Sequence, residues 1–176
     1  AYCTSLENLA AAGIKTVCYN FMPILDWTRT ELRARQTHGG TAMQFKLLQF
    51  AAFDLCILER PNAKASYSAE QQNAAYKAFD RLNEDEKTAL QRNIVAGLPG
   101  ANDNWTVEDV RNHLDRYKGI DTNTLRQNLI DFLAQVIPTA ERLGMRLCCH
   151  PDDPPFSLLG LPRIMSSTDD YAFILG

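Results

Sequence analysis

Two stretches of the chain repeat one order of elements: a helix end, a glycine and a short apolar run. Residues 6–18 read LENLAAAGIKTVC, and residues 140–148 read AERLGMRLC. We expect Gly13 and Gly144 just after each helix, where a positive φ costs glycine little. The runs that follow are too short for helices and predict β-strands buried on both faces, as in a parallel sheet. The repeat therefore predicts an α/β fold.

Polar residues follow both predicted strands. Ligand-binding groups of α/β folds lie at the carboxyl ends of the strands, which here are Asn20 and His150. His150 opens the segment HPDDPP, whose three prolines stiffen the loop beside the imidazole. A neutral imidazole there is a good ligand for a divalent metal. Asp152 and Asp153 either orient its second nitrogen or cap the next turn. The alternative is a histidine that only forms a hydrogen bond at the rim of the sheet.

The sequence between the two strands predicts mostly helices. Residues 33–45, RARQTHGGTAMQF, predict a β-hairpin that turns at the two glycines. An apolar helix, LLQFAAFDLCIL, follows at 47–58. Three more helices start at the N-cap residues Ser68, Asn83 and Thr106.

A turn-rich loop, GLPGANDNW, separates two of these helices, and a long amphipathic helix follows from about 122 to 143. This is too much helix for one crossover between neighbouring strands. It predicts a helical insertion over about residues 47–120 in an α/β domain.

Composition argues against several classes of partner. The 176 residues are 45% hydrophobic and 22% charged, as in an ordinary globular domain. The net charge of −3 and the lack of a basic block argue against nucleic acid. The longest apolar runs are too short to cross a bilayer, so we expect no membrane partner. A homo-oligomer stays open. Because the chain begins and ends in helix-like sequence, we expect it to be part of a longer chain.

Five cysteines without a CxxC pair predict reduced, mostly buried thiols in a cytoplasmic protein. Cys18, Cys148 and Cys149 lie inside the apolar runs. Disulfides or a metal cluster are the alternative.

Several loop residues are candidates for binding a substrate. Trp27 is expected to anchor its loop. Arg29 and Arg163 each offer a bidentate fork to a carboxylate, with a surface ion pair as the alternative. His38 and His113 receive no function.

Two long motifs, TVCYNFMPILDWTRT and HPDDPPFSLLGLPRI, resemble the mannonate dehydratase family, as do RNIVAGLPGA and the helix before His150. The resemblance covers essentially the whole chain. It implies a (β/α)₈ TIM barrel related to xylose isomerase, and the removal of water from D-mannonate to give 2-dehydro-3-deoxy-D-gluconate in hexuronate breakdown. Phe156-Ser157 departs from the Arg-Pro of some members.

The resemblance also implies a site. It makes His150 a ligand of Mn²⁺ or Fe²⁺, with a cysteine, a second histidine and an aspartate from later strands completing the set. It favours substrate binding by Asn20, Trp27, Arg29 and Arg163. The catalytic base and acid stay unassigned.

Size limits how much of a barrel this chain can form. A complete (β/α)₈ barrel takes about 250 residues before insertions. We therefore expect residues 1–176 to be an incomplete TIM-barrel domain that is inactive alone. Two alternatives remain. A sugar isomerase or epimerase of the same superfamily would show more strand-end glutamates, and a non-catalytic α/β interaction domain leaves HPDDPP and DWTRT unexplained.

Overall fold

The computed structural model describes residues 1–25, 27–96 and 105–176. They form two compact units. The first comprises residues 1–22, 119–156 and 162–176, and the second comprises residues 23–118 and 157–161. The turn-rich loop predicted at 97–105 lies, apart from Trp105, outside the described residues. None of the described helices is both long and apolar enough to cross a membrane.

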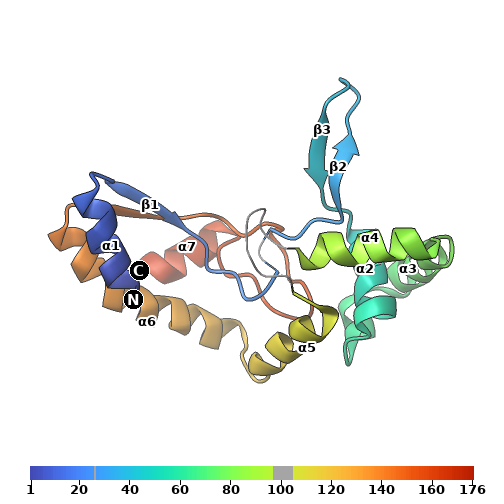
Figure 1. Ribbon diagram of the computed structural model, residues 1–176. Helices are drawn as coiled ribbons and strands as arrows, with labels where there is room; N and C mark the ends of the chain where they lie inside the picture. Colours follow the sequence, from blue (N-terminus) through green and yellow to red (C-terminus); the bar gives the residue numbers. More distant parts are fainter. Residues whose placement is uncertain (26, 97–104) are drawn as a thin grey trace. The chain divides into compact units, whose positions relative to one another are not determined.

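The first unit contains a two-stranded parallel sheet. Strand β1 (Thr16–Tyr19) pairs with β4 (Arg146–Cys149) in a register that runs from Thr16 opposite Arg146 to Tyr19 opposite Cys149. Figure 1 shows the two strands side by side. The unit's helices are α1 (Tyr2–Ala11), α6 (Thr122–Arg142) and α7 (Thr168–Leu175). Gly13, after α1, has φ +85°, and Gly144, after α6, has φ +61°. The predicted order of helix, glycine and parallel strand is thus confirmed.

Only one face of this sheet is buried. Val17 and Leu147 pack with residues of α1 and α6, around the buried Leu6 and Ala140. Side chains alternate along a strand, so the next residues point to the opposite face. Thr16, Cys18, Arg146 and Cys148 on that face are exposed.

The prediction of strands buried on both faces is therefore wrong for this chain, as is that of buried thiols at Cys18 and Cys148. The physical reason is that α1 and α6 cover the same face of the sheet. Cys149, on the covered face, is half-buried, and all five cysteines are free thiols.

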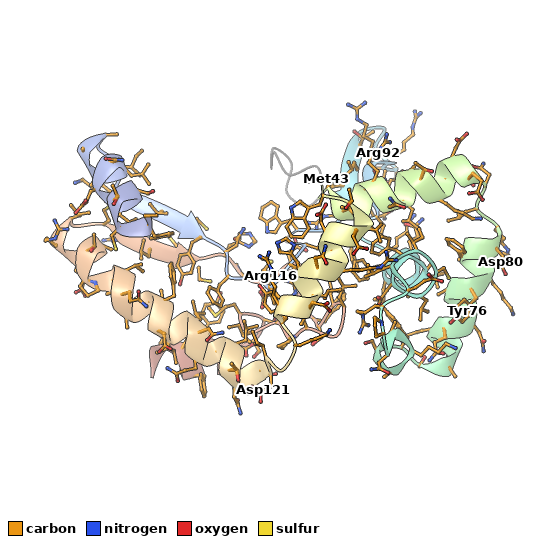
Figure 2. All side chains as sticks on the ribbon, turned by 60° about the horizontal axis from the view of Figure 1, so that its bottom comes forward. Met43, Tyr76, Asp80, Arg92, Arg116 and Asp121 are labelled. Carbon is orange, nitrogen blue, oxygen red and sulfur yellow. The ribbon has the colours of Figure 1, made fainter. Side chains whose placement is uncertain are left out.

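The second unit begins with an antiparallel hairpin and continues with helices. Strands β2 (Glu31–Arg35) and β3 (Thr41–Gln44) project from the helices of their unit in Figure 1. The helical segments are α2 (Leu47–Phe53), the π-helix η1 (Asp54–Leu58), the 3₁₀ helix η2 (Ala63–Ser66), α3 (Ala69–Asp80), α4 (Glu84–Val95) and α5 (Val107–Arg116). Figure 2 labels Tyr76 and Asp80 on α3. The core is centred on Phe50, Phe53, Leu58, Ile94 and Val110.

The predicted helix starts of this unit are confirmed. Ser68, Asn83 and Thr106 each form a capping box with the residue three positions later. The apolar helix predicted at 47–58 is α-helical only to Phe53 and then widens into η1. The unit contains residues 47–118 of the predicted insertion. That this segment interrupts a barrel stays a prediction.

Candidate functional site

His150 lies directly after β4, at the carboxyl end of the parallel pair. Its backbone N–H donates to the carbonyl oxygen of Tyr19 at 2.8 Å, which extends the ladder by one residue. Asn20 directly follows the partner strand β1. The two strands are parallel, so their carboxyl ends meet at one edge. The prediction that Asn20 and His150 share this edge of the sheet is confirmed.

The imidazole of His150 is half-buried, and its Nδ1 lies 2.6 Å from the carbonyl oxygen of Pro151. A carbonyl oxygen only accepts hydrogen bonds, so this contact favours the tautomer with its proton on Nδ1. That tautomer carries its lone pair on Nε2, the atom that would bind a cation. The Pro151 carbonyl thus helps to orient the ring.

Asp152 holds the loop that follows His150. Its side chain is buried and accepts hydrogen bonds from the Met165 N–H at 2.7 Å and the Ser166 hydroxyl at 3.0 Å. Its own N–H donates to the Met165 carbonyl at 3.0 Å. The two functions considered for Asp152 were orienting the imidazole and capping the next turn, and its carboxylate instead binds groups 13 and 14 residues further along the chain. The carboxylate ties residues 151–153 to residues 165–166.

Arg163 lies just before this tied segment and is only 9% exposed. Its guanidinium is thus largely removed from the surface. The segment after it is fixed by Asp170, which accepts hydrogen bonds from the N–H groups of Ser166 and Ser167 and forms an ion pair with Arg126 at 2.6 Å. Arg163 is thus presented by a backbone held at both Asp152 and Asp170.

The thiol nearest to His150 is poorly suited to act as a thiolate. Burial raises the pKa of Cys149, a hydrogen bond with Tyr19 lowers it by less, and the negative charge of Asp152 raises it a little further. Burial, with Cys149 alongside, likewise raises the pKa of Tyr19. Both groups therefore remain protonated at neutral pH and serve as packing beneath the strand ends.

Trp27 and Arg29 belong to the second unit. Trp27 is half-buried with a φ of +54°, and an Nη1 hydrogen of Arg29 donates to the Thr28 carbonyl at 2.9 Å. The expectation that one of them reaches toward His150 stays a prediction. His38 and His113 serve local structure: Nδ1 of His38 accepts from Gly40 N–H, and His113 stacks on Trp105.

The described residues do not supply a complete metal site by themselves. No group of three His, Cys, Asp or Glu side chains among them is arranged to hold a metal ion. The sequence alone did not indicate the buried hydrogen bonds of Thr28 and Thr30 or the Arg126–Asp170 ion pair. Only Asp170 had a local signal, because Ser167 and Asp170 have the spacing of a capping box.

The chain is similar to known proteins along its whole length. The family model of D-mannonate dehydratase (UxuA) matches residues 1–176. The mannonate dehydratase of Rhizobium meliloti is 52% identical over 97% of this chain and 42% of its own length, and mannonate dehydratase 1 of Agrobacterium fabrum is 53% identical over the same shares. The chain thus spans less than half the length of these curated relatives.

A solved structure is also similar. The crystal structure of mannonate dehydratase from Streptococcus suis serotype 2 matches with a TM-score of 0.60 and 28% identity, over 99% of this chain and 36% of that one. The family match extends over every residue, including both motifs that suggested it. The chain therefore belongs to the D-mannonate dehydratase family.

Proposed function

We propose that this chain is part of an enzyme that removes water from D-mannonate to give 2-dehydro-3-deoxy-D-gluconate, in cytoplasmic hexuronate breakdown. Membership of the family over residues 1–176 supports the reaction. The observation that carries the proposal is His150 at the carboxyl end of a parallel strand pair, where α/β enzymes place their ligands. The activity belongs to a full-length enzyme that contains this chain.

We place β1 and β4 as two strands of a (β/α)₈ barrel. Their buried face packs on α1 and α6, as the outer face of a barrel strand packs on the surrounding helices. The opposite face, with Thr16, Cys18, Arg146 and Cys148, would then line the barrel interior. His150 and Asn20 would lie at the mouth of that barrel.

His150 suits a divalent cation such as Mn²⁺ or Fe²⁺, because the contact of its Nδ1 with the Pro151 carbonyl directs Nε2 as the ligand atom. The remaining ligands would come from strands outside this chain. The cation would neutralise the negative charge that the substrate carboxylate gains when the C2 proton is removed.

The other residues act on the sugar acid itself. Arg29 and Arg163 would bind its carboxylate through their planar forks, and Asn20 and Trp27 would hold its hydroxyl groups and carbon chain. A fixed carboxylate makes the C2 proton more acidic, because the charge left at C2 spreads onto oxygens that already have donors. An acid from outside this chain would protonate the C3 hydroxyl as it leaves.

The test is to incubate the full-length enzyme with D-mannonate and Mn²⁺, and to follow the sugar acid by mass spectrometry. A dehydratase produces an acid lighter by one water, and a chelator abolishes the reaction. An isomerase or epimerase yields a product of unchanged mass, and an interaction domain yields none. Either of these two results would overturn the proposal.

A further inference from the structure

The segment that carries Trp27 and Arg29 alternates between packed and partly exposed side chains. Thr28 is fully buried and Thr30 is 3% exposed, whereas Trp27 and Arg29 are half-buried. The two threonines are therefore packed within the second unit, while Trp27 and Arg29 between and beside them remain partly exposed.

Thr28 satisfies a backbone group at the end of α4. Its hydroxyl donates to the carbonyl oxygen of Ile94 at 2.9 Å, across 66 residues of sequence. Ile94 lies in the last turn of α4, and so does Arg92, which Figure 2 labels. The last four carbonyls of a helix lack a partner within it, so the Thr28 hydroxyl meets a need of the helix and is itself fixed in return.

Thr30 ties the other end of the segment to the hairpin and to the same helix. Its N–H donates to the Gln44 carbonyl at 3.0 Å, and its hydroxyl accepts from the Lys46 N–H at 3.0 Å. The side chain of Asn93, in α4, donates to the Thr30 carbonyl at 3.1 Å. The backbone on both sides of Arg29 is thus anchored to α4.

The same segment contains unfavourable backbone geometry. Leu25 and Trp27 have φ values of +51° and +54°, and neither is glycine. Such a conformation costs about 1 kcal/mol or more at each residue and persists only where the surroundings enforce it. Leu25 is held in the core, and the N–H of Thr28 donates to its carbonyl at 3.3 Å. Strain retained in a loop between rigid anchors is a feature of binding sites.

We propose that Thr28 and Thr30 are positioning residues, which fix Trp27 and Arg29 in the orientation that binds the sugar acid, with Arg29 at its carboxylate. This inference rests on the proposed function, since it takes Arg29 to touch the substrate. The helical unit would thereby contribute to substrate affinity through α4, although α4 itself need not contact the substrate.

The test uses the full-length enzyme and four variants: Thr28→Val, Thr28→Ser, Arg29→Ala and the double variant Thr28→Val/Arg29→Ala. Thr28→Val keeps the shape of the side chain and removes the hydroxyl. We expect it to raise KM for mannonate about fivefold, from the loss of about 1 kcal/mol of positioning. Thr28→Ser should restore KM, because it keeps the donor. Thr88→Val is the matched control, because Thr88 is an exposed threonine of α4, the helix to which Thr28 is bound.

The double variant separates positioning from general loss of structure. If Thr28 acts through Arg29, then Thr28→Val changes KM little once Arg29 is alanine. The inference would be overturned by an unchanged KM in Thr28→Val. It would also be overturned if the fold-change in KM of the double variant equalled the product of the fold-changes of the two single variants. Failure of the proposed function is recognised separately, because the unmodified enzyme would then not dehydrate mannonate at all.

Discussion

A buried ion pair in the second unit gives a quantitative test of how the fold is held together. The Asp54 carboxylate is fully buried at the point where α2 widens into η1. Arg60 donates to it from Nε at 3.0 Å and from Nη2 at 2.8 Å, and the Tyr67 hydroxyl donates at 2.9 Å. The Arg60 side chain is itself only 11% exposed. We predict that Arg60→Leu is far more damaging than removal of both charges together.

The magnitude follows from what each variant leaves behind. Arg60→Leu leaves a buried carboxylate without its counter-charge, which costs about 3–5 kcal/mol. Asp54→Leu/Arg60→Leu removes the charge as well and costs about 1–2 kcal/mol, chiefly because the Tyr67 hydroxyl loses its acceptor. Burial and the Asp54 carboxylate raise the pKa of Tyr67, so this hydroxyl stays a donor. Arg81→Leu, at an exposed position of the same unit, should cost less than about 0.5 kcal/mol.

Urea unfolding followed by tryptophan fluorescence is the assay. Both tryptophans, Trp27 and Trp105, belong to the second unit, so the signal reports on that unit. With a urea dependence of about 1.5 kcal/mol per M, Arg60→Leu should lower the midpoint by about 2–3 M. The reasoning is refuted if the double variant is as unstable as Arg60→Leu, since the cost would then lie in lost packing rather than in an uncompensated charge.

Three further predictions concern the first unit and the chain alone. Burial opposes ionisation of Asp170, but hydrogen bonds from Arg126, Ser167 and two backbone N–H groups outweigh it and lower the pKa of Asp170. The stability that the ionised carboxylate contributes to the fold is therefore present at neutral pH and lost as the pH falls through that lowered pKa. Asp170→Asn should therefore lower the stability of α7 by about 1.5–3 kcal/mol at pH 7, measured by hydrogen exchange of its amides. This difference in stability between the variant and the unmodified protein should shrink in acid, and a difference that stays constant would count against the prediction. Cys18 and Cys148 are opposite each other in the ladder and exposed, so a short bis-alkylating reagent should link them and should fail in Cys18→Ser. A link from Cys18 to Cys149 instead would contradict the register. The 176-residue chain alone should bind Mn²⁺ weakly and not dehydrate mannonate, and turnover by it would show that one histidine is enough.

The sequence predicted most of the local structure because the signals were themselves local. Glycines after two helices, capping residues at Ser68, Asn83 and Thr106, and the hairpin turn each depend on a few neighbouring residues. The parallel pairing of β1 and β4 was also predictable, since the same short unit occurs twice. The burial of the strands was not predictable, because it depends on which faces of the sheet the helices cover. An apolar strand such as RLCC has one exposed face in this chain.

The candidate site was predictable only in part, for a related reason. His150 could be located from the strand before it and the prolines after it. The function of Asp152 could not, because its partners at Met165 and Ser166 lie over ten residues away. The anchoring of Thr28 by Ile94 spans 66 residues, and no local pattern indicates it. The metal ligand set and the barrel itself rest on the family resemblance, and they stay proposals.

The central claim is that His150 is a metal ligand in a site completed by other strands. The most direct measurement compares His150→Ala with the unmodified full-length enzyme, by Mn²⁺ affinity and by dehydration of mannonate at saturating Mn²⁺. His38→Ala, in the exposed hairpin turn, is the matched control. We predict that His150→Ala loses at least about tenfold in Mn²⁺ affinity and most of its activity while keeping its helical circular dichroism, because a strand-end ligand adds little to the packed core. Near-normal turnover and Mn²⁺ affinity in His150→Ala would contradict the account.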